Sequence, residues 1–252
     1  QIEARLLLWR AGDTATLDQI RAGFHIYEAY ARAVMGWTGT PGTLKSTDKL
    51  LYATCKATVL GGGYGAGRVG FRKAAKQFAK LELTLEQSQA MVEEFRTRNP
   101  KIPELWQWHN GWFAVAAAQG DATHEIELES GRRIRYFNPR WGIDKKGKRQ
   151  MMAETVRGDK RWTRSFWGGK LTENDRQGAA RDVMRDGVLA CEDVGIRTHF
   201  TVHDELVTSV PEDQAQDALA EIREILPQAA EWARECPLGV DAYAASRYYV
   251  KE

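Results

Sequence analysis

The sequence predicts an α+β fold, with helices dominant in the first part of the chain and a small antiparallel sheet near its end. From 16 to 35, apolar residues recur at spacings of three and four, as they do on one face of a helix; they are Leu17, Ile20, Phe24 and Tyr27. Near the end, Thr198–Val202 and Leu206–Val210 are rich in β-forming residues and flank three polar residues, which predicts a hairpin. A chain of 252 residues with 43% hydrophobic content can bury one large core or two modest ones.

Between these two regions, the pattern predicts mostly helices with one short strand-rich stretch. Glycines interrupt the chain at 36–42, where a loop is expected, and at 61–67, inside a largely helical segment over 46–78. Thr84 and Gln87 have the spacing of a capping box, which begins a helix that runs to Arg98. The remaining expected elements are, in order, a strand end turning into a helix at 2–9, a helix at 103–119, strands at 125–128 and 133–137, a polar loop at 145–149, helices at 171–193, 213–226 and 228–235, and a final strand at 238–243.

Composition argues against several classes of protein. No run of 18 apolar residues is present, so no membrane-spanning segment is expected. Residues 1–5 lack the basic start and the apolar stretch of a signal peptide. Three cysteines, Cys55, Cys191 and Cys236, lie far apart without metal-ligand spacing, which favours reduced thiols and a cytoplasmic location.

Basic residues gather in two stretches of a chain whose formal net charge is only +2. Residues 44–80 hold eight Lys or Arg and one acid, and residues 144–164 hold eight basic residues and three acids. Such stripes suit a polyanion that lies along particular surfaces, although charge alone favours two solvated faces. If the second stripe contacts template or duplex phosphates, binding should weaken steeply with added salt.

The tip of the expected hairpin carries His203, Asp204 and Glu205 between apolar strands. Two adjacent carboxylates repel each other unless a cation lies near. Hard divalent ions such as Mg²⁺ prefer such oxygens together with substrate phosphates. The local pattern alone favours a solvated acidic turn, and a metal site is the alternative.

A second candidate segment runs from Lys56 to Gly67. Lys56, Leu60 and Tyr64 recur every four residues and would form one stripe on a helix. A lysine there can contact a phosphate, and an aromatic ring beside glycines can lie against a base. The segment is not a P-loop, whose lysine follows the glycines and precedes Ser or Thr. A glycine-rich hinge beside a core helix is the other interpretation.

In order and spacing, three segments together resemble motifs A, B and C of the family A DNA polymerases, the DNA polymerase I family. Residues 1–5 match the end of motif A, residues 56–65 match motif B, and residues 203–205 match motif C. Residues 23–27 also resemble the family, and residues 173–177 resemble its phage-type members. The resemblance covers nearly the whole chain.

This resemblance implies a helical fingers subdomain inserted in a palm with a small antiparallel sheet. It assigns residues 1–15 and 166–252 to the palm, and residues 16–165 to the fingers and connecting segments. It also implies a template-directed DNA polymerase that adds dNTPs to a primer 3′ end. Its partners would be primer-template DNA and dNTP, in a bacterial cell or a phage-infected host.

In the family, two Mg²⁺ ions assist attack of the primer hydroxyl on the α-phosphate of the incoming dNTP. The motif A and motif C aspartates mainly hold these metals; Asp204 matches the motif C aspartate, and Glu205 matches a weaker or outer participant. Lys56 matches the lysine that neutralises the triphosphate. The resemblance therefore makes these three the catalytic candidates, and Asp204 with Glu205 the metal ligands.

Other positions match contacts to the nucleotide and to the duplex. Glu3 matches the steric gate that crowds a ribose 2′-hydroxyl. Tyr64 matches the ring that stacks near the template base and pairs with that glutamate. The remaining nucleotide-contacting candidates are Gln1, Tyr27 and Leu60, and the DNA-contacting candidates are His203, Asn174 and Gln177.

The chain departs from the family pattern in four ways. The motif A aspartate would lie three positions before Gln1, so one expected metal ligand is outside this chain. Tyr52 stands where the family has an arginine. Leu60 stands in place of Phe or Tyr, which implies looser ribose contacts. His25 replaces an acid, and Tyr27 lies where a histidine is common, so the role of this tyrosine stays open.

We therefore expect a segment of a longer polypeptide, or one piece of a polymerase made in two, joined by an upstream piece. Alone, the segment is not expected to polymerise. A single-subunit RNA polymerase is one alternative, against which Glu3 and Glu205 argue, and a non-catalytic DNA-binding module is another. An unrelated metal-dependent hydrolase would need more clustered ligands than the sequence has. The polymerase interpretation requires Asp204 and Lys56 to face each other across a cleft.

Overall fold

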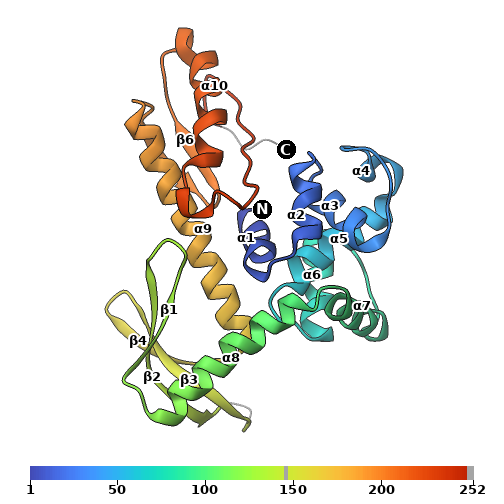
Figure 1. Ribbon diagram of the computed structural model, residues 1–252, viewed down its shortest axis with the longest axis vertical. Helices are drawn as coiled ribbons and strands as arrows, with labels where there is room; N and C mark the ends of the chain where they lie inside the picture. Colours follow the sequence, from blue (N-terminus) through green and yellow to red (C-terminus); the bar gives the residue numbers. More distant parts are fainter. Residues whose placement is uncertain (145–146, 249–252) are drawn as a thin grey trace.

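Helices make up most of the chain, and the structure is α+β as the sequence predicts. The computed structural model describes residues 1–144 and 147–248. Its α-helices are α1 (Ile2–Ala11), α2 (Thr14–Arg21), α3 (Ile26–Met35), α4 (Leu44–Thr47), α5 (Lys49–Gly62), α6 (Arg68–Ala79), α7 (Leu85–Arg98), α8 (Lys101–Gln119), α9 (Gly168–Asp193) and α10 (Ala215–Ile225). Helices α2 to α7 gather on the right of Figure 1, α9 runs along the left, and α8 leads from one group to the other.

Two antiparallel sheets accompany the helices. A four-stranded meander, paired in chain order, contains β1 (Thr123–Glu127), β2 (Arg133–Ile143), β3 (Arg149–Arg157) and β4 (Lys160–Phe166). A separate hairpin contains β5 (Thr198–Val202) and β6 (Glu205–Thr208) and lies near α10 (Figure 1). The hairpin and the first two strands are confirmed, whereas β3 and β4 are absent from the prediction. Of the polar loop expected at 145–149, residues 145 and 146 lie outside the described residues, and Arg149 already belongs to β3.

The single helix predicted over 16–35 is instead two helices, α2 and α3. Gly23 between them has a φ of +90°, which glycine adopts far more readily than other residues do. His25 then caps α3, because its ring accepts a hydrogen bond from the backbone two residues on. The Glu28 side chain accepts from the His25 backbone N–H and completes a capping box. The apolar spacing therefore continues across the break although the helix does not.

Other local predictions are confirmed near the middle of the chain. The predicted capping box forms at Thr84 and Gln87. The Thr84 backbone N–H donates to the Gln87 side chain at 2.9 Å, and the Gln87 backbone N–H donates to the Thr84 hydroxyl at 3.1 Å. Helix α7 begins at Leu85, directly after Thr84, and ends at Arg98, as expected. The glycine-rich break also lies where the sequence predicts it, between the end of α5 and the start of α6.

The predictions for the two ends of the chain are partly wrong. Residues 2–9 belong entirely to helix α1. Residues 228–235 contain only short 3₁₀ turns, and the strand expected at 238–243 does not form. A strand needs a neighbouring strand to satisfy its backbone groups, and residues 238–243 instead line a groove with α10.

Helix α1 joins two parts of the hydrophobic core. Leu7 and Leu8 pack in a cluster with residues of α3 and α5, among them Tyr30. Leu6 packs in another cluster with Ala179 and Val183 of α9. This short helix is apolar around most of its surface, so it fixes the helical group against α9. None of the helices in residues 1–144 and 147–248 is both long enough and apolar enough to cross a bilayer.

Candidate active site

The acidic hairpin tip is tighter than the sequence predicts. Glu205 pairs with Val202 and is the first residue of β6, so only His203 and Asp204 form the turn. His203 has a φ of +54°, a left-handed conformation that histidine tolerates better than β-branched residues do. This geometry leaves the Asp204 side chain 57% exposed at the tip. Its carboxylate is therefore open to a ligand.

The start of α1 lies directly at this tip. The backbone nitrogen of Gln1 lies 2.8 Å from Asp204 Oδ2. Segments 203 residues apart in the chain are thus in contact, as expected if motifs A and C form one site.

A row of side chains leads from Gln1 to helix α5. The Gln1 amide nitrogen lies 2.7 Å from His25 Nε2. The His25 ring contacts the Tyr27 ring at 4.9 Å, and the Tyr27 ring contacts the Tyr52 ring at 5.5 Å between centroids. Tyr52 lies one helical turn before Lys56, so both belong to one face of α5. The face of α5 that carries Lys56 is therefore linked to the hairpin tip by four consecutive contacts.

Tyr27 is a core residue rather than an open binding group. Its side chain is 6% exposed and packs in the cluster around α1 and α3. Burial raises the pKa of its hydroxyl to about 12. Leu60 packs against the same cluster, half-buried. These two candidates belong to the packed core and do not line the groove at the acidic tip.

Glu3 and Tyr64 lie near each other and near the acidic tip. Burial raises the pKa of Glu3, and the negative charges of Glu173 and Asp204 raise it further. Burial also raises the pKa of Tyr64, and the negative charge of Glu3 contributes to that shift. A carboxylate and a tyrosine ring, which the resemblance pairs, are therefore electrostatic neighbours in the fold.

Close backbone packing holds the Tyr64 loop against the start of α9. A side chain at Gly169 would collide with the Tyr64 carbonyl, and one at Gly168 would collide with the Trp106 carbonyl. Trp106 also donates a hydrogen bond to the Gly63 carbonyl at 2.9 Å. The two glycines therefore permit an approach that no larger residue allows.

The two DNA-contacting candidates on α9 differ in their surroundings. Gln177 is exposed, and its hydrogen bond with Glu3 opposes the rise in the pKa of that glutamate. Asn174 donates a hydrogen bond to the Tyr136 hydroxyl at 2.9 Å. Gln177 thus belongs to the group around Glu3, whereas the Asn174 amide is engaged with the four-stranded sheet.

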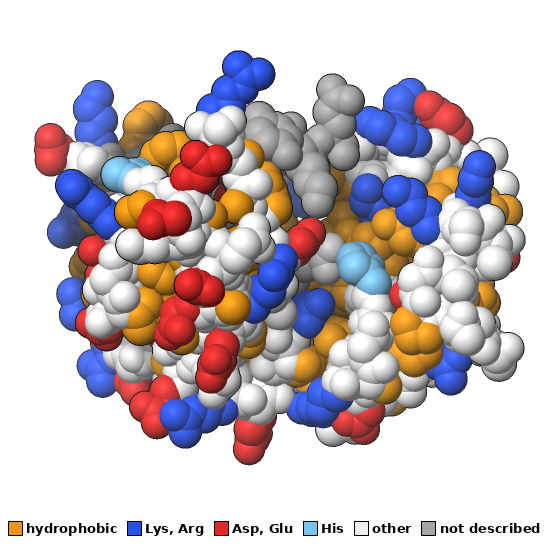
Figure 2. Space-filling view, turned by 90° about the horizontal axis from the view of Figure 1, so that it is seen from above, with side chains coloured by type: hydrophobic (Ala, Val, Ile, Leu, Met, Phe, Trp, Pro, Cys, Tyr) orange, Lys and Arg blue, Asp and Glu red, His pale blue; other side chains and the backbone are white. Residues whose placement is uncertain are grey.

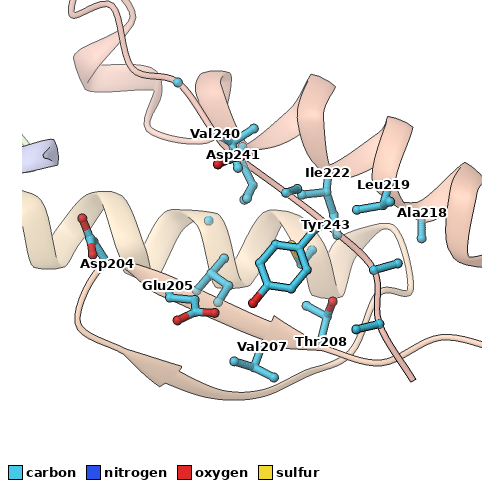
Figure 3. Close-up of a pocket in the computed structure, with 18 of the residues that line it drawn as sticks. Asp204, Glu205, Val207, Thr208, Ala218, Leu219, Ile222, Val240, Asp241 and Tyr243 are labelled. Carbon is cyan, nitrogen blue, oxygen red and sulfur yellow. The ribbon is translucent and has the colours of Figure 1, made fainter. Parts of the chain in front are cut away.

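A groove of about 1390 Å³ opens at the acidic tip. Gln1, His25, Asp204 and Glu205 line it together with β6, α9, α10 and the segment 238–248. Figure 3 shows Asp204 at one end of this groove, with Leu219, Ile222, Val240 and Tyr243 farther along it. Seen from above, the molecule is hollowed between two masses, and Lys and Arg side chains gather on the rim above the helical group (Figure 2). Lys56 does not line the groove itself.

The donor set suits a hard cation but is incomplete. Asp204 and Glu205 offer carboxylate oxygens, which Mg²⁺ prefers. Within residues 1–144 and 147–248, no group of three or more His, Cys, Asp or Glu side chains is arranged to hold a metal. These two carboxylates would therefore need further oxygen ligands from substrate phosphates, water or another segment.

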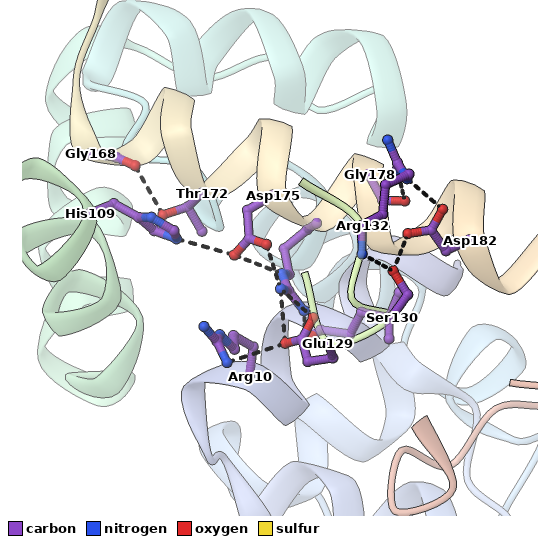
Figure 4. A network of polar contacts seen from close by, with 12 residues as sticks. Arg10, His109, Glu129, Ser130, Arg132, Gly168, Thr172, Asp175, Gly178 and Asp182 are labelled. Carbon is purple, nitrogen blue, oxygen red and sulfur yellow. Dashed lines mark hydrogen bonds and ion pairs between the residues drawn. The ribbon is translucent and has the colours of Figure 1, made fainter. Parts of the chain in front are cut away.

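A buried polar network behind the site was not predicted from the sequence. The Arg176 and Asp175 side chains are fully buried and lie 2.7 Å apart. Arg176 also contacts Glu129 at 3.0 Å, and Asp175 contacts His109 Nε2 at 3.1 Å (Figure 4). Burial acts to raise the pKa of Asp175, but the hydrogen bond from His109 and the charge of Arg176 outweigh it and lower that pKa.

The spacing of apolar residues along α9 could have indicated this network. Asp175 lies four residues after Leu171 and four before Ala179, and both of those residues are fully buried. A carboxylate in the middle of an apolar row must be paired, because an isolated buried charge is very unfavourable. The network ties α8, α9 and the β1–β2 turn together, and Arg10 of α1 joins it through Glu129.

Comparison with known proteins agrees with the resemblance of the motifs. No protein-family model matches the chain. It is 28% identical to the DNA polymerase of Bacillus phage SP02, over 100% of this chain and 40% of that protein. It is 23% identical to the thermostable DNA polymerase I of Thermus thermophilus, over 96% of this chain and 25% of that protein.

A similar fold occurs in a solved structure, the POL domain of Pol1 from M. smegmatis in complex with DNA primer-template and dNTP. The TM-score is 0.58 and the identity 19%, over 91% of this chain and 35% of that one. The chain thus spans less than half the length of each of these proteins. In sequence and in fold, this chain is therefore family A DNA polymerase-like.

Proposed function

We propose that this chain supplies the fingers and part of the palm of a template-directed DNA polymerase, which adds dNTPs to a primer 3′ end. Residues 1–15 and 166–252 would belong to the palm, and residues 16–165 to the fingers and connecting segments. The observation that carries the proposal is the convergence of three distant segments. Gln1, at the start of α1, contacts Asp204, and the Glu3 carboxylate interacts electrostatically with both Asp204 and Tyr64.

In this proposal, each candidate has one task at the site. Asp204, with Glu205 beside it, would hold Mg²⁺ together with a carboxylate from a segment outside this chain. Two bound Mg²⁺ ions would lower the pKa of the primer hydroxyl and neutralise the leaving phosphates. Lys56 would contact the triphosphate, and His203 and Gln177 would contact DNA near the primer end. Primer-template DNA and dNTP, present in the M. smegmatis complex, are the proposed partners.

Glu3 is proposed to select the sugar of the incoming nucleotide. Its half-buried carboxylate interacts electrostatically with Tyr64, and there it would crowd a 2′-hydroxyl. Replacing Glu3 with alanine should raise rNTP incorporation relative to dNTP by roughly 10- to 200-fold, the range that one small steric difference in a pocket provides. The ratio of kcat/KM for the two nucleotides measures it.

Glu86→Ala is the control, because Glu86 is an acid at the exposed start of α7. An unchanged ratio in Glu3→Ala would contradict the assigned role of Glu3. Preference for rNTP in the unaltered protein would favour the single-subunit RNA polymerase instead.

Lys56 is proposed to bind the triphosphate. It forms no ion pair with a described carboxylate, so its charge is available to an anion. Replacing Lys56 with alanine should lower kcat/KM for dNTP by about 10- to 100-fold, because a hydrogen bond to a charged group contributes about 1.5–3 kcal/mol. Lys73→Ala on the exposed surface of α6 is the matched control, and an equal effect of both changes would count against the assignment.

A further inference from the structure

The four-stranded sheet has two chemically different faces. Helix α8 covers one of them, since the Phe113 ring contacts Tyr136 at 5.6 Å and Phe166 at 5.8 Å between centroids. Met151 and Ala153 of β3 point to the same side and are buried there. Helix α8 crosses the sheet in Figure 1. Successive residues of a strand alternate between this α8-facing side and the opposite, outer side, and in β2 the alternation changes phase at the register shift between Phe137 and Arg140.

Charges on the outer side are paired with one another. Arg133 lies 3.0 Å from Glu127, and Arg135 lies 2.7 Å from Glu125. Glu154 lies between two further arginines, Arg140 and Arg161, each at 3.6 Å. This outer side is therefore a solvated surface of nearly balanced charge, and offers little net attraction to a polyanion.

The α8-facing side extends beyond the area that α8 covers. Its exposed part carries large aromatic side chains, unlike the outer side. The strand register places Trp141 beside Met151, and Trp162 beside Thr155, on this side. Their side chains are nevertheless 42% and 50% exposed. Large aromatic rings in water on an otherwise packed sheet face are a mark of a binding surface.

Basic residues accompany these rings without acidic partners. The register puts Arg149 beside Ile143, and Arg164 beside Ala153, again on the α8-facing side. The Arg149 guanidinium lies 4.9 Å from the centre of the Trp141 ring. None of the described residues that point to this side from β1 to β4 is an acid, and no described carboxylate pairs with Arg149 or Arg164.

We propose that this tryptophan–arginine face, made of Trp141, Arg149, Trp162 and Arg164, binds single-stranded DNA at a site separate from the cleft near Asp204. Unpaired guanidinium groups neutralise phosphates, and exposed indole rings stack on bases, which a single strand presents and a duplex hides. The outer side of the same sheet lacks both features. The inference goes beyond polymerisation, because it needs neither a metal nor a primer.

The test compares two double variants of the same sheet. Arg149→Ala/Arg164→Ala removes the unpaired cations, and Arg133→Ala/Arg135→Ala removes two cations of the outer side. The probe is a fluorescein-labelled 12-nucleotide oligo(dT), with binding followed by anisotropy over a range of salt concentrations. The first variant should bind about 10-fold more weakly, with a slope of log affinity against log salt shallower by about 1.4, or 0.7 for each lost phosphate contact. The second should differ from the unaltered chain by less than about twofold.

Stacking is tested by single changes at the rings. Trp162→Ala and Trp141→Ala should each weaken oligo(dT) binding by roughly 5- to 150-fold, while Trp162→Phe keeps most of the affinity. A 12-base-pair duplex should be affected far less by these changes. Equal loss in the two double variants, or full affinity after both tryptophan changes, would overturn the proposal. Primer extension is measured in parallel, so that a failure of this site and a failure of the proposed polymerase activity remain distinguishable.

Discussion

Replacing Asp204 with alanine is expected to lower primer extension by the intact protein at least about a thousandfold. A carboxylate at an open turn is the strongest candidate metal ligand in the described chain, and metal-ion catalysis contributes several kcal/mol to such reactions. Because each 1.36 kcal/mol corresponds to a factor of ten in rate, losing about 4 kcal/mol gives this decrease. The rate of single-nucleotide incorporation measures it. Primer-template affinity should change little, since one exposed side chain is removed.

The matched control for this change is Asp241→Ala. Asp241 is an exposed acid of the same groove, away from the hairpin tip (Figure 3). Its replacement removes the same charge and should leave incorporation within about twofold, as an exposed surface change usually does. Normal extension by Asp204→Ala would instead favour a non-catalytic DNA-binding module.

Local sequence patterns predicted the elements whose limits are set locally. The capping box at Thr84, the glycine break after α5 and the β5–β6 hairpin each depend on residues within a few positions of one another. The two-residue tip was harder to predict, because it requires the left-handed conformation of His203. Sequence spacing alone does not distinguish it from a three-residue turn.

Strands β3 and β4 were not predicted because their residue composition is typical of a polar loop. Their region is rich in basic residues, and one side of each strand carries exposed polar groups that hide the alternation. The Gly158-Asp159 turn was the available signal, since such a dipeptide between two runs predicts a hairpin. The segment 238–243 shows the reverse case, because a strand is predicted there and does not form. Its apolar residues alternate clearly, but a strand also needs a partner strand, and the sequence does not show whether one lies beside it.

The site could be predicted as a set of residues but not as a geometry. Gln1, Glu3, Tyr64 and Asp204 are neighbours only because α1 packs between α5 and α9. No local pattern fixes that packing. The buried location of Tyr27 depends on the same core, so the sequence could indicate its place in a motif but not its burial.

Replacing Arg176 with methionine is expected to lower the free energy of unfolding by about 3–5 kcal/mol. Methionine keeps much of the packing but removes the cation, which leaves the fully buried Asp175 and the nearby Glu129 without their shared partner. Breaking a buried ion pair costs this much because one charge remains buried and uncompensated. Urea denaturation at pH 7 measures the change. Arg133→Met, which breaks exposed pairs on the sheet, should cost no more than about 1 kcal/mol.

The pH dependence separates this electrostatic effect from lost packing. In the unaltered protein the pKa of Asp175 is lowered on folding, so its stabilisation is present above the unfolded value of about 3.9 and is lost as the pH falls through the folded pKa. Without Arg176, the opposing effect of burial should bring that pKa up although His109 still lowers it, so Arg176→Met keeps less of this pH-dependent stabilisation. The difference between the two proteins should therefore be largest near pH 7 and shrink below about pH 4. A difference that stays constant from pH 7 to pH 3 would mean that packing, and not the charge of Arg176, holds α9 against α1 and α8.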